Sequence, residues 1–79
     1  MSTQILLDYR GVGCPENFAR ITMELVDIPL GTQLQVLLDT VEEVGNVSRS
    51  LIRDGQTILA SNVENNYWSI VIKKSSNYL

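Results

Sequence analysis

Residues 5–26 read ILLDYRGVGCPENFARITMELV, and within this stretch the spacing of the apolar side chains changes from every second residue to every third or fourth. The alternation over residues 3–9 is typical of a strand. Two glycines and a proline then interrupt the pattern, and the wider spacing that follows predicts an amphipathic helix over residues 15–27. The chain therefore opens with a strand, a glycine-containing turn and a helix.

The next two segments repeat the order of a strand and a helix. Residues 33–39 carry apolar side chains on both sides, which predicts a strand in the middle of a sheet. After Thr40 the helical spacing returns, and the Asp-Gly pair at 54–55 ends the second predicted helix. The side chains assigned to the buried face of this helix are Val44, Val47, Leu51 and Ile52.

The last third of the chain predicts a β-hairpin and a short tail. Residues 56–63 and 67–74 are rich in β-branched and aromatic side chains, and the polar residues 64–66 have the length of a hairpin turn. Residues 75–79 lack a partner pattern, and we expect them to form a frayed tail.

The predicted order of elements is β-α-β-α-β-β. Since the connections between parallel strands are right-handed, both helices should lie on one face of a mixed four-stranded sheet. This arrangement is an α/β two-layer sandwich. It leaves the other sheet face only partly covered. The apolar side chains expected on that face are Leu6, Leu37, Tyr67 and Val71.

The composition limits the class of protein. The chain has 79 residues, fewer than the usual domain size of about 100–150, so we expect one domain over residues 1–79 with its core within residues 5–74. The net charge of −3 disfavours binding to nucleic acid. One cysteine cannot form an intramolecular disulfide, and no signal-peptide or membrane-span pattern occurs, so we expect a cytoplasmic location and no membrane partner.

Cys14 is the candidate reactive residue. It stands between the first strand and the first helix, where we expect it to cap the helix and to accept hydrogen bonds from the N–H groups of Glu16 and Asn17. Helix N-termini favour the thiolate, which is the nucleophilic form. Arg10 adds positive charge near this position, whereas Glu16 opposes it. Two interpretations stay open: an exposed sulfur nucleophile, or a buried apolar cysteine.

The residues that the chain lacks exclude several reactions. Without histidine there is neither a Cys-His nor a Ser-His pair, so hydrolysis by a catalytic triad is unsupported. The carboxylates of Asp39, Glu42 and Glu43 fit a solvated helix start better than a metal cluster, and we expect neither a metal nor another cofactor. Transfer of sulfur between cysteines remains, because a thiolate attacks a persulfide without an external base.

Residues 7–17, LDYRGVGCPEN, resemble the L-D-x-x-G-x-x-C-P-x-P signature of the TusA-like (SirA and YedF) sulfur-carrier family through their Leu-Asp, Gly and Cys-Pro positions. Residues 31–36, GTQLQV, resemble the Gly-x-x-Leu-x-Val second strand of that family, and residues 72–74 resemble its closing Ile-x-Lys. The likeness covers about residues 5–74. Asn17 stands where the family has its second proline.

The resemblance implies a two-layer sandwich that carries a persulfide on Cys14. The residues implied to bind around it are Arg10, Gly11, Gly13, Pro15, Glu16 and Asn17. The implied partners are a cysteine desulfurase or rhodanese-like sulfur donor and a downstream acceptor in tRNA thiolation, molybdenum cofactor assembly or sulfur oxidation. Because Asn17 offers a backbone N–H that a proline lacks, we expect that N–H to point at the sulfur and to bind the thiolate.

Three functions are compatible with the sequence. The first is a sulfur carrier or sulfurtransferase, with Cys14 as acceptor and donor and Arg10 as a helper on the anionic side. The second is a non-catalytic interaction or regulatory module that retains the fold, an alternative that Asn17 motivates. The third is RNA binding through the sheet face, suggested by Tyr67, Trp68, Arg49 and Arg53. Strand aromatics are usually core residues and the chain is acidic, so RNA binding is disfavoured.

Overall fold

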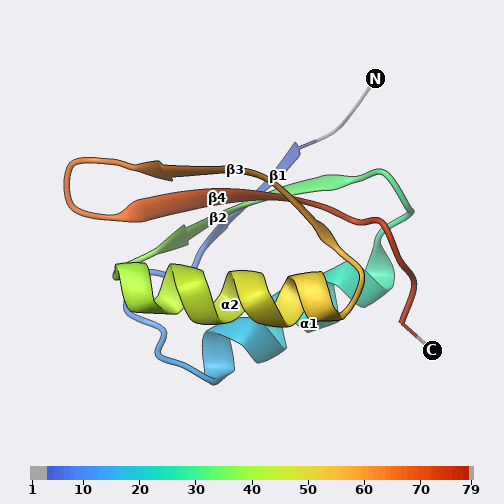
Figure 1. The fold of residues 1–79 in the computed structure, drawn as a ribbon, viewed down its shortest axis with the longest axis horizontal. Coiled ribbons are helices and arrows are strands. Elements are labelled where there is room, and N and C mark those ends of the chain that lie inside the picture. The colour runs from blue at the N-terminus through green and yellow to red at the C-terminus, as the bar shows by residue number, and fades with distance from the viewer. Residues whose placement is uncertain (1–3, 79) are drawn as a thin grey trace.

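The computed structural model describes residues 4–78 as a four-stranded sheet with two helices on one face (Figure 1). The elements in chain order are β1 (Gln4–Asp8), α1 (Glu16–Asp27), β2 (Gln33–Leu38), α2 (Val41–Arg53), β3 (Thr57–Val63) and β4 (Trp68–Lys73). The predicted two-layer sandwich and its β-α-β-α-β-β order are confirmed. The predicted start of the first strand at Thr3 lies outside the described residues.

The strands lie in the order β1-β2-β4-β3, with β1 parallel to β2 and the other pairs antiparallel. Asp8 at the end of β1 pairs with Leu37 near the end of β2. Leu38 in turn pairs with Trp68, the first residue of β4. The turns that follow β1 and β2 and the hairpin turn before β4 therefore lie at the same end of the sheet.

The core fills the space between the sheet and the helices. The central position of β2 is confirmed, since Leu34, Val36 and Leu38 are fully buried. The buried apolar side chains of the other elements are Ile21 and Leu25 from α1, Val44, Val47 and Leu51 from α2, and Ile70 and Ile72 from β4. Alternation along the strands and three-to-four spacing along the helices place these side chains on one side of each element.

Helix α2 begins with a capping box. The Thr40 hydroxyl accepts a hydrogen bond from the N–H of Glu43 at 3.2 Å, and the Glu43 carboxylate accepts one from the N–H of Thr40 at 3.2 Å. Two of the N–H groups that a helix start leaves without partners are thereby satisfied. The helix ends as predicted, with Gly55 in the left-handed region at φ +91°.

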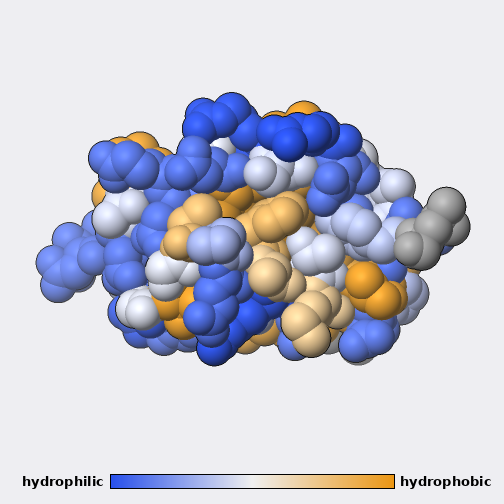
Figure 2. Space-filling model, turned by 90° about the horizontal axis from the view of Figure 1, so that it is seen from below, coloured by the Kyte–Doolittle hydropathy of each residue, from blue (hydrophilic) through white to orange (hydrophobic). Residues whose placement is uncertain are grey.

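One residue assigned to the buried face of α2 is exposed. Ile52 has 59% of its surface accessible, because it follows the fully buried Leu51 and each residue turns the helix by about 100°. Figure 2 looks onto the helix layer and shows apolar side chains gathered among hydrophilic ones on this surface. The large apolar side chains exposed on the helices are Met23, Val26, Val41 and Ile52.

The prediction of a frayed C-terminal tail is wrong for residues 75–78. The Gln56 side chain is buried, and its Oε1 atom accepts hydrogen bonds from the N–H groups of Ser75 and Ser76 at 2.8 and 3.2 Å. Its Nε2 atom donates to the carbonyl of Ser76 at 2.9 Å. Tyr78 packs against the core and donates to Asp54 at 3.0 Å. One buried glutamine thus holds residues 75 and 76 in place, although the sequence of this segment has no periodic pattern.

The sheet face opposite the helices is partly apolar. Leu6 is 60% exposed there, whereas Leu37 is buried and Tyr67 and Val71 are half-buried. On the same face Gln35 donates a hydrogen bond to Ser69 at 2.9 Å. The prediction that this face is only partly covered is therefore confirmed.

Replacing Gln56 with alanine should destabilise the fold. The change removes three hydrogen bonds and leaves two backbone N–H groups without their acceptor, so we expect the free energy of unfolding in urea to fall by about 2–3 kcal/mol. Gln4→Ala, at an exposed position of β1, is the control and should change it by less than about 0.5 kcal/mol. Equal effects of the two variants would contradict the role given to Gln56.

Candidate functional site

Cys14 lies in the turn between β1 and α1, and it is exposed. Of the two interpretations, exposure agrees with an accessible nucleophile and not with a buried apolar cysteine. The predicted capping role of Cys14 is wrong, because α1 begins one residue later, with Pro15 at the N-cap position and no side-chain cap. The thiol therefore stands just outside the helix.

The expected hydrogen bond from Asn17 to the sulfur is also wrong. The N–H of Asn17 donates to the carbonyl of Gly13 at 3.0 Å, which is the first i→i−4 bond of the helical segment. The Asn17 side chain is fully buried and does not face solvent beside Cys14. A donor already used inside the helix leaves no N–H directed at the thiol.

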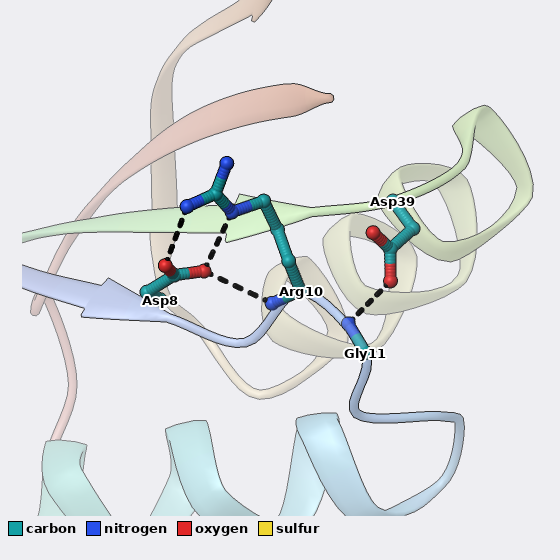
Figure 3. A network of polar contacts seen from close by, with 4 residues as sticks. All are labelled: Asp8, Arg10, Gly11 and Asp39. Atoms are coloured by element: carbon teal, nitrogen blue, oxygen red, sulfur yellow. Dashed lines mark hydrogen bonds and ion pairs between the residues drawn. The ribbon is translucent and has the colours of Figure 1, made fainter. Parts of the chain in front are cut away.

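The turn that carries Cys14 has a defined backbone. Val12 donates its N–H to the carbonyl of Tyr9 at 3.0 Å, and Gly11 adopts φ +83°, a value that side-chain-bearing residues rarely adopt. The N–H of Gly11 donates to the carboxylate of Asp39 at 2.5 Å (Figure 3). Asp39 follows β2, so this bond joins the turn after β1 to the turn after β2.

Arg10 is engaged on the side of the turn next to the hairpin. Its Nε and Nη2 atoms donate to the two carboxylate oxygens of Asp8 at 2.8 and 2.7 Å, and its backbone N–H donates to Asp8 at 3.1 Å (Figure 3). Its guanidinium lies over the Tyr67 ring, 4.7 Å from the centroid. These hydrogen bonds hold the pKa of Asp8 at about 2 and raise the pKa of Arg10. The guanidinium is thus occupied by Asp8 and Tyr67.

The other predicted site residues differ in their surroundings. Gly13 and Pro15 flank Cys14 and are exposed. Glu16, expected to oppose an anionic sulfur, forms an ion pair with Arg20 one helical turn further on. Of the predicted site residues, Gly13 and Pro15 therefore lie next to Cys14 along the chain, whereas Arg10 and Glu16 each have a partner of opposite charge.

Two residues that contact the candidate site, Glu43 and Asp39, are absent from the predicted set of site residues. Asn17 donates from Nδ2 to Glu43 at 3.1 Å and to the carbonyl of Val12 at 3.4 Å. Glu43 lies at the start of α2, as predicted, but it is half-buried, so the prediction that it is solvated is wrong. The sequence does contain a signal for its position, because the Thr-x-x-Glu pattern at 40–43 is that of a capping box. The sequence also gave no sign that Asp39 accepts a hydrogen bond from the turn that carries Cys14.

The carboxylates of Asp8, Asp39 and Glu43 near this turn accept hydrogen bonds from N–H and O–H donors. Within residues 4–78 no group of three or more histidine, cysteine, aspartate and glutamate side chains is placed to hold a metal ion. Over the same described range, no helix has both the length and the apolar character needed to cross a membrane.

These features define a small α/β domain that presents a thiol on the turn between its first strand and its first helix. The family model described as Sulfurtransferase TusA matches residues 5–74, and the chain belongs to this family. It is 36% identical over 70 residues to a protein of Archaeoglobus fulgidus named "Putative sulfur carrier protein", a match that covers 87% of this chain and 80% of that protein.

A solved structure supports the same fold. The crystal structure of the SirA-like protein from Desulfitobacterium hafniense matches with a TM-score of 0.79 and 20% sequence identity. The match covers 91% of this chain and 99% of that one. The two chains thus share the arrangement of two helices on a four-stranded mixed sheet.

The two glycines of the turn should differ in their tolerance of a side chain. Gly11→Ala should lower the free energy of unfolding in urea by about 1–2 kcal/mol, because its positive φ is strained for alanine. Gly13 has no positive φ and no atom within 4 Å of an added Cβ, so Gly13→Ala should leave stability unchanged or slightly higher. Similar losses at both positions would contradict the assigned turn geometry.

The pKa of Asp8 provides a test of the Arg10 contacts. Arg10→Gln should raise this pKa from about 2 toward the ordinary value of 3.8, as measured by NMR titration of the carboxyl carbon. Since the pKa is lowered on folding, the pair stabilises the fold above about pH 4, and this contribution is lost as the pH falls toward 2. Arg20→Gln, which removes the partner of Glu16, should leave the pKa of Asp8 unchanged.

Proposed function

We propose that this protein is a sulfur carrier that holds a persulfide sulfur on Cys14 and relays it from a donor protein to an acceptor protein. The observation that carries the proposal is the exposed Cys14 thiol on a turn whose backbone is hydrogen-bonded to the next turn of the fold. Membership of the TusA family and similarity to the Archaeoglobus fulgidus protein support the sulfur-carrier role.

The loading step is a substitution at sulfur. The Cys14 thiolate attacks the outer sulfur of a donor persulfide, R–S–SH, and a new S–S bond forms at Cys14 while the donor S–S bond breaks. The donor leaves as the thiolate R–S⁻, and the hydrogen stays on the transferred sulfur. Charge and electrons balance, so this step requires neither an oxidant nor a cofactor.

Unloading repeats the same substitution in the other direction. A thiolate of the acceptor attacks the outer sulfur on Cys14, and the Cys14 thiolate is the leaving group. A chain without histidine can carry out both steps, since each begins and ends with a thiolate and needs no resident general base. Both steps require a thiol that two different proteins can approach, a requirement that the exposure of Cys14 meets.

The chemistry of this step suggests the partners and the compartment. A cysteine desulfurase or a rhodanese-like protein forms a persulfide on its own cysteine and would supply the sulfur, and a downstream protein in a pathway such as tRNA thiolation would receive it. Free thiols persist in reducing compartments, which supports a cytoplasmic location for a relay that uses the Cys14 thiol.

Mass spectrometry tests the proposal. After incubation with a cysteine desulfurase and cysteine, the intact protein should gain roughly 32 Da, the mass of one sulfur atom, at Cys14. Cys14→Ser should gain nothing, and treatment with a thiol reductant should remove the added mass. If the wild-type thiol is freely alkylated yet gains no sulfur from any donor, the sulfur-carrier proposal fails and a non-catalytic interaction module is favoured.

A further inference from the structure

We propose that Glu43, acting through Asn17, is a positioning residue that holds Cys14 in place for sulfur transfer between proteins. We call the hydrogen-bonded pair of these two side chains the Asn17–Glu43 clasp. The transfer role of the clasp rests on the proposed sulfur-carrier function, whereas its effect on the turn that carries Cys14 does not.

The two oxygens of the Glu43 carboxylate face different parts of the fold. Oε1 accepts hydrogen bonds from the N–H groups of Asp39 and Thr40, each at 3.2 Å, and from the Thr40 hydroxyl at 3.3 Å. Oε2 accepts from Nδ2 of Asn17 at 3.1 Å. One carboxylate therefore organises the start of α2 and also reaches across to α1.

Asn17 extends this connection to the turn on the other side of Cys14. The second hydrogen of Nδ2 points to the carbonyl of Val12 at 3.4 Å, and Oδ1 accepts from the N–H of Phe18 at 2.6 Å. The clasp thus holds the chain at residue 12 and at residue 17, so that Cys14 lies between two fixed points. The bond from Gly11 to Asp39 provides a third attachment to the same segment.

The burial of Asn17 indicates a specific use of its polar atoms. A buried amide is costly unless its groups are hydrogen-bonded, and an apolar side chain would fill this fully buried position without that cost. Here every polar group of the amide has a partner: Oδ1 accepts from Phe18 within α1, and Nδ2 donates to the turn and to α2. The amide therefore does more than fill space, because its Nδ2 hydrogen bonds connect the turn at Val12 to helix α2.

Positioning matters for a reaction between two proteins. The reacting sulfurs must approach to within about 3–3.5 Å in line, and a displacement of about 1 Å can slow such a step by up to about a hundredfold. A small donor reaches an exposed thiol from many directions, whereas a docked protein presents its sulfur from one. The clasp should thus affect transfer from a protein donor much more than transfer from a small one.

Glu43→Gln breaks the clasp with little change in shape. A carboxylate accepts on both oxygens, whereas an amide has one acceptor and one donor end. Whichever way the new amide turns, its NH₂ group faces either Asn17 Nδ2 or the N–H groups of Asp39 and Thr40. One of the two connections is therefore lost.

The measurements compare backbone exchange with sulfur transfer in the full chain. In Glu43→Gln we expect amide hydrogen exchange at Gly11 and Val12 to accelerate by about tenfold. Sulfur transfer from a cysteine desulfurase supplied with cysteine should slow by about tenfold, while transfer from glutathione persulfide stays within about twofold.

Two control variants separate positioning from stability and charge. Glu42→Gln makes the same change of charge at an exposed neighbouring position and should leave both rates unchanged. Gln56→Ala destabilises the fold away from the site and should not slow the desulfurase reaction while the protein remains folded. Equal slowing with both donors, or by Gln56→Ala as much as by Glu43→Gln, would overturn the positioning role.

Failure of the function and failure of the clasp give different results. If the wild-type protein accepts sulfur from neither donor, the sulfur-carrier function is wrong, and the transfer role of the clasp falls with it. If the wild-type protein accepts sulfur but Glu43→Gln changes neither the exchange rates nor the transfer rates, the function stands and the clasp is wrong.

Discussion

The parallel pairing of β1 with β2 is the constraint on which the end of the molecule that carries Cys14 depends. The pairing of Asp8 with Leu37 fixes where each strand ends, so the turns that follow leave the sheet side by side. The helices that follow both turns lie on the same face of the sheet (Figure 1). Residues about 26–28 positions apart in sequence, such as Gly11 and Asp39, thus come within hydrogen-bonding distance. The antiparallel β3–β4 hairpin adds Tyr67 at the same end, where it contacts Arg10.

Different interactions stabilise the core between the two layers and the turns near Cys14. Apolar side chains of both helices and of the two central strands hold the layers together through burial. At the end that carries Cys14, carboxylates accept hydrogen bonds from backbone N–H groups: Asp8 from Arg10, Asp39 from Gly11, and Glu43 from Asp39 and Thr40. These acidic side chains serve as acceptors that order the turns, which gives them a role without any acid–base chemistry. Each bond contributes only about 1 kcal/mol, but together they define the backbone that carries Cys14.

Periodicity in the sequence was sufficient for the fold, because strands and helices bury side chains at regular intervals. It placed β2 at the centre of the sheet, and the right-handed connections of parallel strands placed both helices on one face. The family resemblance over residues 5–74 is confirmed by the family match. Contacts that leave no repeating pattern in the sequence were not predicted. The buried amide of Asn17 meets Glu43 across 26 positions, and Gln56 fixes Ser76 across 20, and neither pair leaves a repeating pattern. The capping position shifted from Cys14 to Pro15, since a one-residue change in a helix boundary is beyond what propensity decides.

An exposed and chemically free Cys14 thiol in the folded protein is the central claim. The most direct measurement is the rate of iodoacetamide alkylation of Cys14 in the native protein, compared at the same pH with the rate for the chain unfolded in urea. We predict that the two rates agree within about tenfold, because the exposed thiol is open to a small reagent. A native rate lower by a factor of about one hundred or more would mean that the thiol is closed off by the fold, and it would contradict the proposed relay of sulfur through this residue.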